Sequence, residues 1–264
     1  MSETFTSLRF RDRIGAGPSL GFYPAPHRYH LYLSPGCPLS LRVSITLGLL
    51  GLEDSVGTTV LSDPAGACDA LAAAALRTAY ETTRHHYDGP LTVPALCDRW
   101  SGRVVSNHTP DILDDLALHF AAPDDTAAPR LRPDGLASDI DAIRELLDGG
   151  LLQDTALDLL DAQLASGPYM LGGTLTAADV DVWVALAHAD ADADTQRRIA
   201  GRDRLRSYLR RLSAHPAFQR IPGPEGEREH TAHDLCSVDK DCVGDQSRVT
   251  VLAGHECQRQ ALAC

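Results

Sequence analysis

Apolar and polar positions in the first part of the chain predict two short strands with a helix between them. His30–Leu33 is a run of residues that favour strands, and a Ser-Pro-Gly sequence ends it. From Cys37 to Leu52, apolar residues recur at helical spacing around most of the surface, which predicts a buried helix. The run Ser55–Leu61 predicts a second strand.

The next residues predict a helix, a hairpin and a further helix. Residues 63–88 contain a loop followed by a helical stretch, and Asp111–His119 has helical periodicity. Between them, the apolar runs Pro94–Cys97 and Arg103–Ser106 flank a Ser-Gly turn typical of a β-hairpin. Two strands joined through a helix and followed by a hairpin predict an α/β unit with a mixed sheet.

Beyond residue 120 the pattern becomes helical. Residues 121–134 are rich in Ala, Pro and Asp, which is typical of a linker. Thr176 and Asp179 have the spacing of a capping box, which begins a helix. Periodicity disappears after Phe218. The predicted helices are Leu136–Asp148, Leu151–Leu164, Ala177–Ala189 and Arg202–Ser213.

These patterns predict an α/β plus all-α fold made of five segments. They are an extended N-terminal arm, an α/β domain, a linker, an all-helical domain and an irregular tail containing Cys and His. In that order they span residues 1–26, 27–120, 121–135, 136–220 and 221–264.

Charge and composition narrow the possible partners. The 264 residues carry a net charge of -12, and because phosphate binding needs a basic surface we expect no nucleic-acid partner. The acidity also argues against an anionic membrane surface, and no apolar run approaches the ~20 residues that span a bilayer. Since residues 1–13 lack an apolar signal segment, we expect a cytoplasmic protein. The odd number of cysteines, seven, favours free thiols over a disulfide framework.

Cys37 is the strongest candidate for chemistry. It follows a strand and a Pro-Gly break, and Pro38 stands where proline is favoured in the first turn of a helix. A helix N-terminus offers partial positive charge and free N–H groups, which stabilise a thiolate. The alternative is an inert thiol packed beneath the helix start. Arg42, one turn further on, either assists the thiolate or is solvated.

Pro94 opens the third predicted strand, where a proline is tolerated at a first position. Only about 5–6% of X–Pro bonds are cis. A cis bond after Val93 would turn the backbone of Val93 outward, where it could pair with a bound peptide.

A set of short motifs accompanies these elements over about residues 5–220. They are Arg9–Asp12, Arg28–Ser34, Cys37 and Pro38 with Arg42, Gly51–Val56, Thr92–Leu96, Gly102–Asn107, Glu145–Gly149 and Tyr169–Asp179. In this order they resemble the cysteine-type glutathione S-transferases, in particular the Xi class of glutathionyl-hydroquinone reductases, which is related to the omega class. The resemblance implies an N-terminal thioredoxin-like domain that binds a thiol, followed by the helical domain of that family.

The resemblance also implies a reaction. The Cys37 thiolate would attack the sulfur of a thioether-conjugated hydroquinone or of a mixed disulfide, and a second thiol would resolve the protein-bound mixed disulfide. Glutathione or another low-molecular-weight thiol would be the cosubstrate, and an electrophilic or thioether-conjugated small molecule the partner. The family implies a homodimer, and we expect no metal. The implied thiol-binding residues are Pro38, Leu39, Arg42, Thr92, Val93, Pro94, His108 and Thr109.

Two departures from the family concern recognition. Leu39 replaces a tryptophan, and His108, mostly neutral near pH 7, replaces the carboxylate that faces the glutathione amine. Thr109 can still cap its helix. We therefore hypothesise a modified thiol or a specialised conjugate as substrate. The alternatives are a thiol-dependent tailoring enzyme (conjugation or isomerisation) of specialised metabolism and a non-catalytic binding protein with this fold.

The remaining polar clusters favour simple interpretations. His85 and His86 point in different directions on a helix, which favours a solvated surface over a metal pair. We expect a solvated turn at the acidic run of Asp190, Asp192 and Asp194. The tail contains residue types that bind zinc, but at spacings that match no strong finger pattern. Those residues are His230, His233, Cys236, Cys242, His255 and Cys257.

Overall fold

A computed structural model of the chain describes residues 9–15, 21–61, 67–120, 128–148, 154–189 and 193–219. The tail that was predicted from residue 221 onward, with its Cys and His residues, lies outside the described residues. So do Asp190, Asp192 and parts of the predicted arm and linker. Among the described helices, none is both long enough and apolar enough to cross a membrane.

A mixed four-stranded sheet forms the first half of the fold, in the order β2-β1-β3-β4. β1 (Tyr29–Leu33) pairs in parallel with β2 (Gly57–Val60) and antiparallel with β3 (Ala95–Asp98), which forms the predicted hairpin with β4 (Arg103–Ser106). Arg11 forms a bridge with Ser106, so the arm runs along the outer edge of β4. The predicted α/β unit is confirmed, although β2 is shorter than expected.

The two-residue period of the strands divides the first half into two cores. Tyr29, Leu31 and Leu33 point to the face covered by α1 (Pro38–Leu50) and α3 (Thr109–Asp115). Tyr32 points to the opposite face, which α2 (Ala67–Thr83) covers. α1 ends at Gly51, whose φ of 63° is a left-handed conformation that favours glycine.

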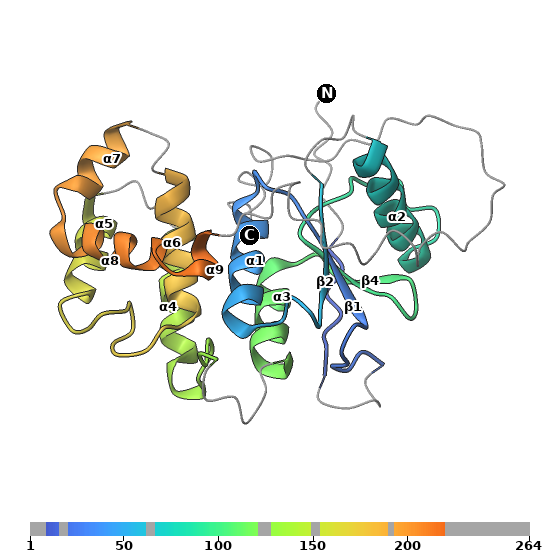
Figure 1. Cartoon of the computed structure of the whole chain (residues 1–264), viewed down its shortest axis with the longest axis horizontal. Helices are drawn as coiled ribbons and strands as arrows, with labels where there is room; N and C mark the ends of the chain where they lie inside the picture. Colours follow the sequence, from blue (N-terminus) through green and yellow to red (C-terminus); the bar gives the residue numbers. More distant parts are fainter. Residues whose placement is uncertain are drawn as a thin grey trace.

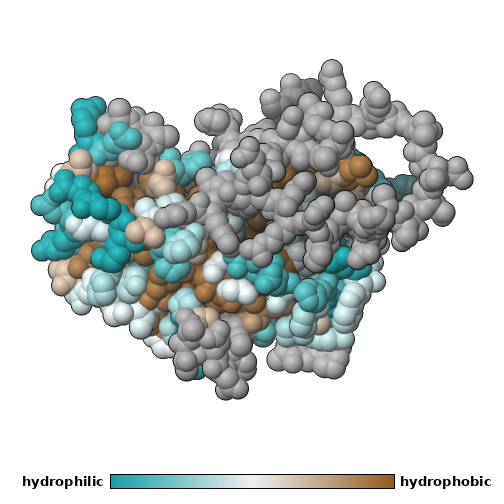
Figure 2. Space-filling model, viewed as in Figure 1, coloured by the Kyte–Doolittle hydropathy of each residue, from teal (hydrophilic) through white to brown (hydrophobic). Residues whose placement is uncertain are grey.

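The second half is helical and packs against the outer side of α1 (Figure 1). The described part of this half contains the short helix η3 (Asp134–Leu136) and six α-helices. These are α4 (Ala137–Asp148), α5 (Asp154–Gln163), α6 (Ala177–Ala189), α7 (Ala193–Ala200), α8 (Asp203–Ser213) and α9 (Pro216–Gln219). Figure 2 shows that hydrophilic residues gather over the end formed by α7 and α8.

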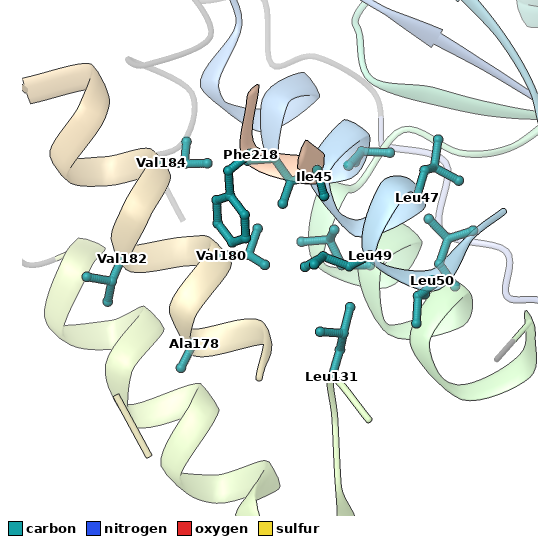
Figure 3. Packing of buried hydrophobic residues seen from close by; sticks show 14 of the residues in the cluster. Ile45, Leu47, Leu49, Leu50, Leu131, Ala178, Val180, Val182, Val184 and Phe218 are labelled. Carbon is teal, nitrogen blue, oxygen red and sulfur yellow. The ribbon is translucent and has the colours of Figure 1, made fainter. Parts of the chain in front are cut away.

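Apolar side chains fill the junction between the two halves. Ile45 and Leu49 of α1 lie opposite Val180 of α6, and Phe218 of α9 inserts beside them (Figure 3). Trp183 of α6 packs edge-on against Phe218, with ring centroids 5.2 Å apart, and donates a hydrogen bond to Ser213. Because α6 contacts α1, α4 and α9, it is apolar on several faces.

One half of the predicted Thr176–Asp179 capping box is present, while the Asp179 N–H donates to the Thr176 carbonyl and not to its hydroxyl. The backbone N–H of Thr176 donates to the Asp179 carboxylate at 2.8 Å, and the buried hydroxyl of Tyr208 donates to the same group at 3.0 Å. Met170 N–H adds a further bond at 2.8 Å. One carboxylate therefore ties the start of α6 to α8 and to the preceding loop.

Some predicted elements need correction. The acidic run was expected to be a turn, but Asp194 lies in α7, a helix that the pattern missed because Ile199 is its only buried described side chain. The helix expected from Asp111 starts at Thr109, and residues 116–120 continue it as the π-helical turn η2 (Leu116–Phe120). α9 was also missed, because four residues are too short for periodicity to reveal.

A buried ion pair joins the start of β1 to the end of β3. Arg28 is 4% exposed, and its guanidinium donates to both carboxylate oxygens of Asp98, at 2.7 and 3.1 Å. Tyr23 and Trp100 each lie with a ring centroid 4.6 Å from the Arg28 guanidinium. Trp100 is itself 63% exposed at the hairpin tip.

Candidate active site

Cys37 lies where β1 gives way to α1, as the sequence predicts. It is the residue that caps α1, Pro38 follows at the start of the helix, and the Cys37 N–H donates to the Ser34 carbonyl at 3.2 Å. The residue is 1% exposed, and its thiol donates to the backbone carbonyl of Val93, with Sγ and O 3.7 Å apart. The helix start thus brings its positive end to a thiol that also contacts the Val93 loop.

The other described free thiol has a different environment. Cys97 lies in β3 on the α2 face, and burial, with a smaller effect of the neighbouring Asp98 charge, raises the pKa of its thiol to about 12. A thiol that stays protonated near neutral pH is a poor nucleophile. Cys97 is therefore a matched cysteine for comparison with Cys37.

The segment that faces Cys37 is held from behind by side chains of two other elements. The Val93–Pro94 peptide bond is cis. The buried Tyr80 hydroxyl, from α2, donates to the Thr92 carbonyl at 2.9 Å. The Asn107 amide, from the end of β4, donates to the Thr92 hydroxyl at 3.0 Å. The Thr92 hydroxyl is thus hydrogen-bonded within the protein.

Asn107 is itself held by the N-terminal arm. Phe10 N–H donates to the Asn107 side-chain oxygen at 2.8 Å, and the Asn107 N–H donates to the Phe10 carbonyl at 3.1 Å. The Phe10 ring packs against Tyr80, with ring centroids 5.5 Å apart. The arm therefore forms part of the wall behind the Val93 loop.

His108 begins α3 and takes part in a charged cluster. Its Nδ1 lies 3.1 Å from the Asp111 carboxylate, which also accepts two hydrogen bonds from Arg11, at 2.8 and 2.9 Å. Burial lowers the pKa of His108, although Asp111 opposes this shift. Burial alone would raise the pKa of Asp111, but hydrogen bonds from Arg11 and the nearby His108 bring it below its usual value.

The structure brings only part of the predicted thiol site together. Cys37, Pro38, Val93 and Pro94 meet between β1 and α1, and the half-buried Leu39 lies in the first turn of α1. Thr92 stands behind this group and His108 lies beyond Asn107, so these two positions flank it.

The structure bears on two predicted roles. The Arg42 guanidinium is paired and not solvated, since it forms an ion pair with Asp181 of α6, 3.5 Å away. Thr109 does not cap α3, since His108 occupies the cap position and Thr109 is the buried first residue of the helix. The Ser106 hydroxyl accepts the His108 N–H at 3.1 Å instead.

Sequence reasoning assigned no role to four residues that support the site: Arg11, Tyr80, Asn107 and Asp111. Asp111 was within reach, since it follows His108 by three positions and shares its side of the helix start. Arg11 lies 100 positions from Asp111, and no local pattern signals that pairing.

Other candidate ligands stay unsupported within the described part of the chain. His85 and His86 are exposed, with ring centroids 3.8 Å apart. No cluster of three or more metal-ligating side chains occurs among the described residues.

Comparison with known proteins connects this geometry to a family. Residues 134–211 match the family described as "Glutathione S-transferase, C-terminal domain". The chain is 26% identical over 269 residues to the glutathionyl-hydroquinone reductase PcpF of Sphingobium chlorophenolicum, a match that covers 85% of this chain and 80% of that protein.

Two solved structures extend the similarity to the fold. A glutathione transferase from Gordonia bronchialis DSM 43247 has a TM-score of 0.67 at 27% identity, covering 80% of this chain and 78% of that one. The glutathione S-transferase Xi from Phanerochaete chrysosporium has a TM-score of 0.64 at 27% identity, covering 81% and 82% of the two chains.

Proposed function

We propose, because the chain belongs to the glutathione S-transferases and is similar to their Xi class, that it is a thiol transferase with Cys37 as its nucleophile. It would remove or exchange a low-molecular-weight thiol, as the name glutathionyl-hydroquinone reductase describes for its relative. The observation that carries the proposal is the position of the Cys37 thiol, at the start of α1 and against the Val93 carbonyl.

The reaction would consist of two exchanges at sulfur. The Cys37 thiolate attacks the sulfur of the conjugate, a Cys37–thiol disulfide forms, and the electron pair of the broken carbon–sulfur bond takes up a proton at the ring carbon. The thiolate of a second cosubstrate molecule then attacks the bound thiol's sulfur and releases Cys37 as thiolate. Overall, the conjugate and one thiol yield the unconjugated hydroquinone and one small disulfide, so atoms and electrons balance.

The proposed binding roles follow from placement. The Val93 backbone would pair with the peptide-like centre of the thiol, while Pro38 and Leu39 flank its sulfur. Pro94 would keep the Val93 backbone turned toward the ligand. The far end of the thiol would lie toward His108, beyond Asn107.

The residues that would face the end of the ligand remote from its sulfur favour a thiol other than glutathione. The Asp111 carboxylate beside His108 already receives two hydrogen bonds from Arg11, so it is largely neutralised as a partner for a ligand ammonium group. We therefore infer a thiol or conjugate whose far end is not a free ammonium. Protection of Cys37 from alkylation by sub-millimolar glutathione would contradict this inference and leave the thiol transferase proposal intact.

Mass spectrometry of trapped disulfides tests the nucleophile and the thiol together. The protein is incubated separately with the disulfides of glutathione, mycothiol and ergothioneine, and the modified residue is identified. We expect a mixed disulfide on Cys37 with at least one of them. The Cys37→Ser variant should form none and should lose hydroquinone release, while Cys97→Ser should retain both.

The opposite result has a clear meaning. Unmodified Cys37 with all three disulfides, together with full cellular function of Cys37→Ser, would support the non-catalytic binding protein. We also infer a cytoplasmic homodimer from the resemblance, and the mass of the protein in solution checks the dimer.

A further inference from the structure

The Val93 carbonyl is the acceptor for the Cys37 thiol. The Sγ to O distance is 3.7 Å, and both residues are buried, at 1% and 3% exposure. An oxygen that accepts the S–H proton stabilises the protonated thiol, while the same oxygen dipole repels a thiolate. This contact therefore opposes the effect of the helix start on the same sulfur.

The same carbonyl would serve a bound cosubstrate. In the proposed function, the Val93 backbone pairs with the peptide-like centre of the thiol, and an amide N–H is a stronger donor than S–H. The ligand sulfur must also approach Sγ of Cys37 from the side on which this carbonyl lies. The carbonyl oxygen has two lone pairs, but ligand and thiol approach it from the same side, so a bound amide and the Cys37 thiol compete for that side of the acceptor.

The position of the carbonyl is fixed from behind. Tyr80 and Asn107 both bond to Thr92, the residue before Val93, at 2.9 and 3.0 Å. Tyr80 is fully buried, so its hydroxyl has little freedom to follow a moving loop. The residue before Val93 is therefore held in place, which limits how far the Val93 carbonyl can follow the Cys37 thiol.

We propose that binding of the thiol cosubstrate displaces the Cys37 S–H from the Val93 carbonyl and so raises the fraction of Cys37 that is thiolate when the site is occupied. This inference rests on the proposed function. The S–H bond breaks heterolytically: the proton leaves to solvent, the electron pair stays on the Cys37 sulfur, and no oxidation state changes. Tyr80 is a positioning residue, which acts through Thr92 and does not touch substrate.

Charged side chains of α1 and α3 are paired with residues other than Cys37. Arg42, the only charged residue of α1, is paired with Asp181 of α6. On α3, Asp111 is paired with Arg11 and His108, and Asp115 with Arg13. Asp114 of the same helix pairs with Arg132 and Arg144.

The ultraviolet absorbance of the thiolate measures the exchange directly. S-methylglutathione is the probe, because it keeps the backbone amides of a thiol cosubstrate but cannot form a disulfide. Its free ammonium group is expected to weaken its binding, so it is used at saturating concentration. With Cys37→Ser as blank, we expect saturating probe to raise the thiolate fraction of Cys37 near pH 7 by roughly three- to tenfold, the size of one lost hydrogen bond. Binding without a rise in thiolate would overturn the inference while the proposed function stands.

A matched pair of hydroxyl deletions tests the positioning role and needs no ligand. Tyr80→Phe releases Thr92, so the ligand-free thiolate fraction should rise and the probe-induced increase should shrink. Tyr87→Phe removes a hydroxyl that donates to Pro90 at 2.8 Å, in the same aromatic cluster, and should change neither value.

The two failures are distinguishable. If S-methylglutathione does not bind, the glutathione form of the proposed function fails, and the ligand-free comparison of Tyr80→Phe with Tyr87→Phe still decides the inference. Equal thiolate fractions in the wild type and in both variants would overturn it.

Discussion

At the residue scale, burial without a charged partner makes His30 sensitive to acid. His30 is 8% exposed, and its Nε2 lies 2.8 Å from the Thr59 hydroxyl. Gly57 gives its ring room, since a Cβ there would lie 2.6 Å from His30 Nδ1. Burial, aided by the positive charge of Arg99, lowers the pKa of His30 to about 4.

The lowered pKa predicts a loss of stability in mild acid. An unfolded histidine has a pKa of about 6.5, so between that pH and about 4 the unfolded chain binds a proton that the folded chain does not. Stability should therefore fall as the pH decreases through this window, with on the order of 2 kcal/mol lost through His30 by pH 4.5. Urea unfolding of His30→Gln at several pH values should show a pH dependence smaller by that amount.

The exposed His85 supplies the control for this prediction. His85→Gln should unfold with the wild-type pH dependence. If His30→Gln and wild type lose stability in parallel between neutral pH and pH 4.5, the buried imidazole has no part in the acid sensitivity.

At the element scale, the N-terminal arm depends on one buried carboxylate of α3. The Asp115 side chain is 0% exposed, and it accepts Arg13 Nε at 2.7 Å and the Ile14 N–H at 2.8 Å. Arg13→Ala leaves this buried group with one donor fewer, so unfolding free energy should fall by about 1–3 kcal/mol. Chemical denaturation measures the change.

An exposed arginine of the adjoining strand separates this effect from loss of charge alone. Arg103→Ala, on β4, should alter stability by no more than about 0.5 kcal/mol. Equal losses in the two variants would mean that the arm is held by net charge and not by the Asp115 contact.

Elements with a strong local signal could be predicted from the sequence. The residues that their side chains contact in other elements could not. Cys37 follows a strand and precedes a proline and an apolar helix, so the neighbouring residues predict its position at a helix start. Arg42 has the same helical context, but its partner Asp181 lies on α6, and only the packed structure reveals that its charge is used there. α7 escaped prediction because it buries too little apolar surface to produce a period.

At the scale of the whole molecule, a chain of alternating charges joins the two halves. Asp181 of α6, 1% exposed, accepts Arg144 of α4 at 2.8 Å and faces Arg42 of α1 at 3.5 Å. Arg144 also reaches Asp114 of α3, 3.4 Å away. Removing a buried partner leaves charges uncompensated, so Asp181→Ala should cost on the order of 3 kcal/mol in unfolding free energy.

Asp141 provides the comparison within the same network. It also pairs with Arg144, but it is 51% exposed, so Asp141→Ala should cost less than about 1 kcal/mol. Urea unfolding of both variants checks the ranking. An Asp141 variant as unstable as the Asp181 variant would show that burial does not set the strength of this junction.

The two tryptophans give each half of the molecule its own optical signal. Trp100 stands in water at the hairpin tip beside Arg28, whereas Trp183 packs against Phe218 at the junction. Their emission should therefore differ in colour and in access to a quencher such as iodide. With Trp100→Phe and Trp183→Phe as single-reporter proteins, fluorescence can reveal whether the sheet and the helical half melt together or in sequence.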